Sequence, residues 1–328
     1  MKAIVQEGYG PPERVLRLAD VERPPVGDDV LIRLRATSVN TPDWIMVTGV
    51  PYILRLRSGL RRPRTPVRGS DAAGVVEAVG TNVTDLRPGD EVFGSSWTGA
   101  LDTPGTFAEF TVVPASQLIK KPPALTFEEA AASVMSGLTA LIAIRDVGKI
   151  ESGSRVLING ASGGVGTFAV QIASALGAEV TGVSSTRNLD LLRSLGADHV
   201  IDYTEEDFTR DERRYDVILD NVMNHPPSKT ARVLTPTGIF IPNSVGNTGG
   251  LLAGLPRMAR AALMGRGSTD VQPVRCVVNR ENLEALAAYL RSGDVNVVIE
   301  KVYSLTQAAD AVAHMLGHHA RGKVAIAL

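Results

Sequence analysis

A glycine-rich turn between two apolar segments carries the clearest chemistry in this sequence. Gly160-Ala161-Ser162-Gly163-Gly164-Val165-Gly166 follows the β-branched run 155–158, and an apolar helical period follows the turn. Glycines in such a turn let the backbone approach a ligand, and the free N–H groups at the start of the next helix bind an anion. The pattern predicts a strand, turn, helix and strand that hold a dinucleotide pyrophosphate, with these phosphate-binding residues: Ala161, Ser162, Gly163, Gly164, Val165 and Gly166.

The end of the next apolar strand, Val180–Val183, indicates which dinucleotide would bind. NAD-preferring folds place an acidic residue there, on the ribose 2′-hydroxyl, and that charge would repel a 2′-phosphate. Here Ser184, Ser185 and Arg187 follow the strand, and the first carboxylate comes only at residue 190. This favours NADPH, with Arg187 as a charge-assisted partner of the phosphate and Ser184 and Ser185 as neutral donors to it. Tyr203 is a second candidate for the same pocket, and a solvated loop arginine is the alternative.

Length and composition are those of an ordinary soluble protein. The chain has 328 residues, a length that predicts two domains. Of these residues 44% are hydrophobic and 21% are charged, and the net charge of −1 gives no sign of a nucleic-acid partner. The longest uncharged run near the middle, Ala130–Ile144, has 15 residues and predicts a core helix too short to span a bilayer. The start of the sequence lacks a signal-peptide pattern, and the single Cys276 fits a reducing compartment. We therefore expect a cytoplasmic protein.

The first 120 residues predict short strands separated by Pro and Gly turns, which is typical of a barrel-like β domain. The expected strands are Ala3–Gln6, Val15–Leu18, Val30–Ala36, Ala72–Val79, Asp90–Phe93 and Phe107–Val113.

After Pro122-Pro123, helical and strand patterns alternate, which predicts a parallel doubly wound sheet with helices on both faces. The last 50 residues either close that sheet or return to the first domain, and the pattern alone leaves both open. The expected helices are 126–135, 136–144, 188–195, 281–291 and 307–317, and the expected strands are 199–201, 215–219, 238–242, 275–278 and 323–328.

Several motifs in order resemble the medium-chain dehydrogenase/reductase superfamily, and within it the zinc-independent quinone oxidoreductase-like branch. They are GVVEAVG at 74–80, RPGDEVFG at 87–94, GTFAEF at 105–110, GASGGVG at 160–166 and LGADHVIDY at 195–203. The resemblance implies an α/β protein with two domains and, commonly, a homodimer. A GroES-like β-barrel catalytic domain would span 1–123, completed by 279–328, and a Rossmann domain would span 124–278.

The resemblance also bears on metal. Zinc-using relatives hold the catalytic ion with Cys and His ligands, and the corresponding positions here are Asn40, Ser70 and Met135. One cysteine cannot build a four-cysteine structural site. His314 and His318, with His319 beside them, share a predicted helix end, where we expect no carboxylate or thiolate to join them. We therefore expect no metal.

By the same resemblance, Asn40 lies near the nicotinamide and the substrate carbonyl, and Thr139 lies beneath the nicotinamide. Asn243 and Ser244 correspond to residues at the carboxamide. Trp44 and Tyr52 are candidates for the substrate pocket, Tyr52 also as a hydrogen-bond donor; for each of these residues the alternative is a turn cap or a core aromatic.

Without zinc, hydride delivery from NADPH to an acceptor already activated by conjugation remains feasible. The expected substrate is a quinone or the C=C bond of an α,β-unsaturated carbonyl, with the proton coming from solvent. The alternatives are a metal-free alcohol/ketone dehydrogenase and a non-catalytic NADPH-binding regulatory protein.

Two segments lie outside this interpretation. Six arginines occur between 55 and 68 without an acidic residue, which favours a solvated or cleft-covering loop over a nucleic-acid or anionic-lipid contact. Residues 249–267 follow a helical apolar period beside three arginines. That period predicts a pocket lid or dimer contact, with a peripheral membrane helix as the alternative.

Overall fold

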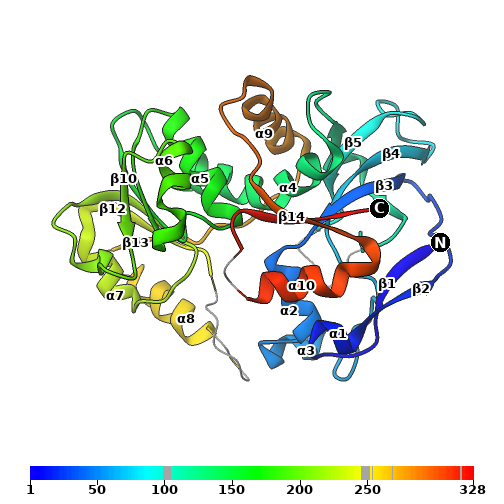
Figure 1. Cartoon of the computed structure of the whole chain (residues 1–328), viewed down its shortest axis with the longest axis horizontal. Coiled ribbons are helices and arrows are strands. Elements are labelled where there is room, and N and C mark those ends of the chain that lie inside the picture. The colour runs from blue at the N-terminus through cyan, green and yellow to red at the C-terminus, as the bar shows by residue number, and fades with distance from the viewer. Residues whose placement is uncertain (99–104, 245–251, 253, 268, 318–319) are drawn as a thin grey trace. The chain divides into compact units, whose positions relative to one another are not determined.

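The computed structural model describes residues 1–98, 105–244, 252, 254–267, 269–317 and 320–328 (Figure 1). The chain forms two compact units. Unit 1 contains Met1–Leu138, Val277–Arg291 and Ile299–Leu328, and unit 2 contains Thr139–Cys276 and Ser292–Val298. The chain therefore leaves unit 1 twice, after residue 138 and after residue 291, and returns to it each time. The domain limits expected from the sequence, 123/124 and 278/279, stay a prediction. The compact units change at 138/139, 276/277, 291/292 and 298/299.

Unit 1 is built on a largely antiparallel sheet of seven strands in the order β14-β15-β3-β4-β5-β7, with β6 also paired to β3 and a separate β1-β2 hairpin. The last strand of the chain, β15, lies inside this sheet, antiparallel to β3 and parallel to β14. The strands are β1 (Lys2–Gln6), β2 (Leu16–Asp20), β3 (Val30–Ser38), β4 (Asp71–Val79), β5 (Glu91–Ser95), β6 (Phe110–Val113), β7 (Leu118–Lys120), β14 (Ile299–Ser304) and β15 (Lys323–Ala327).

Helices of unit 1 share a hydrophobic cluster with strands of this sheet. Trp44 and Val47 of α2 pack with Val312 of α10 and Ile326 of β15, so the first and last parts of the chain share one core. The α-helices that lie wholly or mostly in unit 1 are α1 (Pro12–Val15), α2 (Thr41–Thr48), α3 (Arg55–Ser58), α4 (Phe127–Leu141), α9 (Arg280–Ser292) and α10 (Ala308–Leu316).

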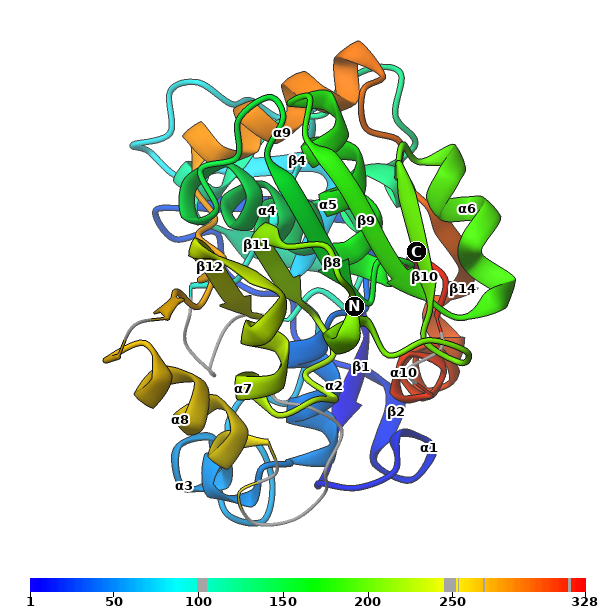
Figure 2. The ribbon, with the colours of Figure 1, turned by 90° about the vertical axis from the view of Figure 1, so that its left-hand side faces the viewer.

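Unit 2 contains a parallel six-stranded sheet in the order β10-β9-β8-β11-β12-β13 (Figure 2). Numbered within the unit, this order is 3-2-1-4-5-6, the arrangement of dinucleotide-binding folds, and the order reverses between β8 and β11. The elements are β8 (Arg155–Asn159), α5 (Gly164–Ala175), β9 (Glu179–Ser184), α6 (Leu189–Ser194), β10 (His199–Asp202), β11 (Tyr215–Asp220), α7 (Pro227–Thr230), β12 (Leu234–Pro242), α8 (Leu255–Met264) and β13 (Asp270–Val271).

Three expectations about elements are wrong. The two helices expected at 126–144 form one helix, α4 (Phe127–Leu141), followed by a π-helical segment to Val147. Gly137 lies inside this helix, and its missing side chain makes room for Leu286, which a Cβ would meet at 2.9 Å. Arg275–Val278 is not a strand: the carbonyls of Val277 and Val278 accept hydrogen bonds from side chains instead.

The third concerns the length of the same helical segment. Among the described residues, Phe127–Val147 is 21 residues long and apolar enough to cross a membrane by length and composition. The argument that the uncharged run is too short therefore fails. Within the structure, 83% of its apolar window is buried, as in the core helix of a globular fold.

Candidate active site

The glycine-rich turn connects β8 to α5 at the point where the strand order reverses. Gly160 has a φ of +74°, a left-handed conformation that favours glycine, and α5 begins at Gly164. A Cβ on Gly166 would lie 2.2 Å from the Gly160 carbonyl oxygen and 2.6 Å from the Ala161 backbone, so only glycine allows this helix to pack on its turn. The turn thus leaves a backbone cradle of the kind that receives a pyrophosphate.

Polar side chains from the ends of neighbouring elements meet beside this turn. Ser184 at the end of β9 donates a hydrogen bond to Ser162 Oγ at 2.7 Å. The Asn188 amide donates to the hydroxyls of Ser162, Ser184 and Ser185 at 3.1, 3.3 and 3.4 Å. Asn188 was not expected at this site from the sequence, although an amide four residues after the strand end is the signal that could have identified it.

Of the four residues expected at a 2′-phosphate, Arg187 and Tyr203 are exposed. The backbone N–H of Tyr203 donates to the Ser184 carbonyl at 3.0 Å, so it lies next to the serine cluster. Asp202 of β10 is paired in register with Ser184, and hydrogen bonds from Thr186 and Thr204 lower its pKa below the ordinary value. An ionised carboxylate on the neighbouring strand therefore accompanies the serines, which the sequence argument did not include.

The carboxyl ends of β11 and β12 carry a second polar group. Asn243 donates its backbone N–H to the Asp220 carbonyl at 2.9 Å and its amide to Asn221 Oδ1 at 2.7 Å. Asn221 Nδ2 and Asp220 Oδ2 are buried and have no hydrogen-bond partner in the described chain. Ser244 is half-buried, and Thr139 is buried on α4. The Nδ2 group of Asn221 is thus a hydrogen-bond donor beside Asn243 that could serve a ligand. Asn221 was not expected at the site from the sequence.

In unit 1, Asn40 lies inside a buried polar network at the start of α2. Its Nδ2 donates to Asp71 Oδ2 at 2.7 Å and lies 3.5 Å from Ser38 Oγ, while its Oδ1 accepts a hydrogen bond from Lys323 Nζ at 2.5 Å. The Lys323 side chain also donates to the Val39 carbonyl at 3.1 Å. The Asn40 amide therefore links buried Lys323 of β15 to buried Asp71 of β4. Asn40 and Lys323 are 283 positions apart in the sequence.

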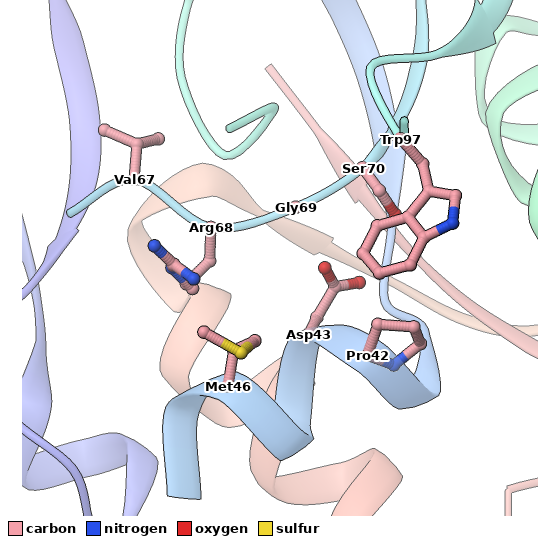
Figure 3. Close-up of a pocket in the computed structure, with 8 residues that line it drawn as sticks. All are labelled: Pro42, Asp43, Met46, Val67, Arg68, Gly69, Ser70 and Trp97. Carbon is pink, nitrogen blue, oxygen red and sulfur yellow. The ribbon is translucent and has the colours of Figure 1, made fainter. Parts of the chain in front are cut away.

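A small cavity of about 20 Å³ adjoins this network (Figure 3). Asp43 points toward the backbone of Gly69 and Ser70, and Trp97 lies over Pro42. The volume of the cavity suits about one water molecule. Ser70 Oγ is buried there without a hydrogen-bond partner in the described chain. The lining residues are Pro42, Asp43, Met46, Val67, Arg68, Gly69, Ser70 and Trp97.

The two expected pocket aromatics lie elsewhere in unit 1. Trp44 is nine-tenths buried in the hydrophobic core, where it packs with Val47 and Phe107. Tyr52 is 45% exposed, and its ring is covered by the Arg55 guanidinium at 4.5 Å. The tryptophan that lines the cavity is Trp97.

We expect stability of unit 1 to fall as the pH rises through the titration of Asp43. Burial raises the pKa of this carboxyl to about 7, against the opposing effect of the Asn40 backbone N–H bond. The folded state then keeps a proton that the unfolded chain has released, so the free energy of unfolding decreases by about 1.4 kcal/mol between pH 6 and pH 8. Asp43→Asn should remove this decrease, measured by urea unfolding at both pH values. Asp28→Asn, at an exposed aspartate, should keep it; equal slopes in all three proteins would contradict the assignment.

Known proteins match both parts of the chain. Residues 27–123 match the alcohol dehydrogenase GroES-like domain, and residues 195–326 match the family described as zinc-binding dehydrogenase. The NAD(P)H oxidoreductase RTN4IP1 of Mus musculus is 32% identical over 99% of this chain and 89% of its own length. The 2-methylene-furan-3-one reductase of Solanum lycopersicum is 33% identical over 99% of this chain and 79% of its own length. This chain belongs to the medium-chain dehydrogenase/reductase superfamily.

A solved structure extends this likeness to the whole fold. The quinone oxidoreductase from Coxiella burnetii superposes with a TM-score of 0.87 and 27% identity, covering 100% of this chain and 99% of that one. The predicted fold class, a GroES-like domain with a parallel Rossmann sheet, is confirmed. The chain is a medium-chain dehydrogenase/reductase related to quinone oxidoreductases and enone reductases.

Zinc chemistry in this superfamily needs thiolate, imidazole or carboxylate ligands around the ion. At the three positions expected from the sequence, Asn40 bonds Asp71, Met135 gives its backbone N–H to Asp71 Oδ1 at 3.3 Å, and Ser70 faces the cavity. The described residues contain no group of three or more His, Cys, Asp or Glu side chains that could hold a metal ion.

The expectation that no carboxylate accompanies His314 is wrong. Glu300 Oε2 lies 3.0 Å from its Nε2, because β14, a strand that sequence analysis missed, runs beside α10. His318 and His319 lie outside the described residues, as do 249–251 and 253 of the second amphipathic segment.

Within that segment, α8 packs on its own unit. Ala261 is buried in the unit 2 core with Met258 against it, and Arg257 donates to the Met223 carbonyl. Leu263 remains exposed.

Proposed function

We propose that this medium-chain dehydrogenase/reductase is an NADPH-dependent, zinc-independent reductase of quinones or of the C=C bond of α,β-unsaturated carbonyls. Bound NADPH would supply the hydride. The chain's own part would be to orient the cofactor and acceptor and to stabilise negative charge that develops on the acceptor oxygen. The cytoplasmic location and the homodimer expected from the sequence remain predictions.

The observation that carries this proposal is the donor set at the three zinc positions. Asn40, Ser70 and Met135 offer an amide, a hydroxyl and a thioether in place of thiolates and imidazole, and Asn40 is already tied to Asp71 and Lys323. Such a set suits neither zinc nor the Lewis-acid activation of a simple alcohol. Acceptors activated by their own conjugation do not need that activation.

The cofactor assignment rests on unit 2. The closely packed turn at Gly166 and the hydroxyl cluster around Ser184 fit a dinucleotide phosphate, with Ala161, Ser162, Gly163, Gly164 and Val165 completing the cradle. Thr139, Asn243 and Ser244 would line the nicotinamide end, and the free amide N–H of Asn221 supports a ligand near Asn243. Arg187, Ser184, Ser185 and Tyr203 would hold the 2′-phosphate.

Within unit 1, Asn40 is the candidate donor to the acceptor oxygen. Its Oδ1 is held by Lys323 and one Nδ2 hydrogen by Asp71, which fixes the amide orientation. The second Nδ2 hydrogen has only the long 3.5 Å contact with Ser38, so it is the one available for a substrate. Tyr52 is the alternative hydrogen-bond donor to the acceptor oxygen. We assign no side chain of the described residues as the acid that protonates the product, so solvent would supply this proton.

A panel of acceptors tests the proposal. NADPH oxidation is followed optically with one ortho-quinone, one para-quinone, one enal, one enone and one simple ketone, with NADH and a chelator as controls. We expect the enzyme to turn over the conjugated acceptors, and we expect a chelator not to inhibit this activity. Turnover only on the ketone would favour a metal-free alcohol/ketone dehydrogenase, and tight NADPH binding without turnover would favour a regulatory protein.

Arg187→Ala tests the choice of NADPH over NADH. Loss of a charge-assisted bond to the 2′-phosphate should weaken NADPH binding by about 10- to 100-fold and leave NADH binding nearly unchanged. Dissociation constants for both cofactors, measured by calorimetry, give the answer. Arg193→Ala, an exposed arginine of α6 paired with Asp190, serves as the matched control. An equal loss for both cofactors would remove Arg187 from the 2′-phosphate site.

A further inference from the structure

The loop that leaves α2 in unit 1 displays apolar side chains on its surface. Leu56 of α3 is 67% exposed and Leu60 is 69% exposed, the highest values among the large hydrophobic side chains of the described residues. Ile53, in the turn before α3, is 41% exposed. Isolated exposed leucines are ordinary on a protein surface, whereas three within eight residues call for a partner.

The arginines of this loop fall into two groups. Arg55 is half-buried, donates to the carbonyls of Thr48 and Gly49 at 3.0 and 2.9 Å, and stacks on Tyr9 at 4.5 Å. Arg68 is buried beside the cavity. The other four are exposed and make no side-chain hydrogen bond or ion pair with any part of the chain that the structure describes: Arg57, Arg61, Arg62 and Arg64.

Contacts from within unit 1 hold the loop in shape. Tyr9 Oη donates to the Gly59 carbonyl at 2.8 Å and lies 2.9 Å from Ser58 Oγ. The backbone N–H of Arg64 donates to the Ser58 carbonyl at 2.9 Å, which closes the turn. The loop therefore presents its leucines and arginines from a fixed backbone and pays little ordering entropy on binding.

We propose that this surface, residues 53–64, docks the protein on an anionic lipid bilayer. The occupant follows from charge and apolarity together. Four exposed cations face solvent, and the sequence has no acidic residue between Asp43 and Asp71. Anionic headgroups attract such a cluster, and the boundary between headgroups and acyl chains accepts the side chains of Ile53, Leu56 and Leu60.

A nucleic acid fits this surface less well. Duplex phosphates would pair with the arginines but leave the two exposed leucines in water. Single strands bind through aromatic side chains on which bases stack, and the nearest candidate, Tyr52, already has the Arg55 guanidinium over its ring. The aliphatic side chains decide between the two partners in favour of lipid.

The test is co-sedimentation of the full-length protein with vesicles. Vesicles of equimolar phosphatidylcholine and phosphatidylserine should retain the wild-type protein, vesicles of phosphatidylcholine alone should not, and added salt should weaken retention. Leu56→Ser with Leu60→Ser, and separately Arg61→Glu with Arg62→Glu, should each lower the apparent partition coefficient by about tenfold or more.

Matched controls separate this surface from its rivals. Leu263→Ser removes a 60% exposed leucine from α8, and Arg210→Glu with Arg213→Glu makes the same change in net charge in unit 2; both should leave retention unchanged. If Leu263→Ser abolished retention on the vesicles, α8 would be the membrane contact in place of residues 53–64. Equal binding to both vesicle types, or retention unaffected by the leucine changes, would overturn the proposal, as would binding of mixed-sequence DNA or RNA without binding of vesicles.

Discussion

Lys323→Met is expected to destabilise unit 1 by about 3 kcal/mol at pH 8, because it leaves a buried charge without its cation. Lys323 is 1% exposed and Asp71 is fully buried, and the Asn40 amide joins them. Burial raises the pKa of Asp71, and the Lys323 charge opposes that increase. Without the lysine, Asp71 holds its proton to higher pH, so the loss of stability is smaller at pH 5.5 than at pH 8.

The tryptophans make this measurement specific. The chain has two, Trp44 and Trp97, and both belong to unit 1, so urea unfolding followed by fluorescence reports that unit alone. Lys323→Met combined with Asp71→Asn should recover part of the loss, because the second change removes the uncompensated charge. Lys301→Met, at an exposed lysine of the adjacent strand, is the control and should cost less than about 1 kcal/mol. A Lys323→Met protein as stable as the control would refute a charge-compensating role.

The second large effect is expected in unit 2. Gly166→Ala should weaken NADPH binding by about 100-fold, equivalent to about 2.8 kcal/mol. Alanine would favour the helix by about 1 kcal/mol, but its Cβ would lie 2.2 Å from the Gly160 carbonyl oxygen, and backbone atoms cannot yield as a flexible side chain can. The start of α5 must therefore shift away from the turn that holds the phosphates.

Gly163→Ala is the matched comparison in the same turn. A Cβ there meets the Gly160 carbonyl oxygen at 3.4 Å, an ordinary contact, and the backbone is extended with φ −82°. This variant should keep the thermal stability of wild type, while Gly166→Ala should lose several degrees by calorimetry. The steric interpretation would be wrong if Gly166→Ala bound NADPH as tightly as wild type.

In unit 2, local sequence patterns predicted the strand, turn, helix and strand around the candidate site, because these elements follow one another directly in the sequence. The turn 160–166 and the serines after β9 lie within about one strand–helix–strand unit, so hydrophobic period and glycine spacing predict them together. Asn188 and Asn221 were missed since an amide after a strand is common in loops. Only the contacts with Ser162 and Asn243 distinguish them.

In unit 1 the deciding contacts are long-range, and periodicity does not reveal them. Nothing near Asn40 in the sequence indicates that a lysine 283 residues later donates to its amide. Likewise, Trp44 was the tryptophan expected at a pocket, but the packing of α2 buries it in the core, and Trp97 lines the cavity instead. The segment 275–278 has a strand-like composition, yet side-chain donors occupy its carbonyls.

The return of the chain to unit 1 also constrains how the protein can be made. A ribosome releases residues 1–138 first and the residues of unit 2 next, but β15 leaves it last. Until then β3 lacks its pairing with β15, although β4 and β6 can already pair with it, and Asn40 and Asp71 lack their lysine. Unit 2, almost continuous in sequence, can complete its sheet earlier. The nascent protein is therefore expected to acquire its second unit before its first, the reverse of the usual N-terminal-first order of synthesis.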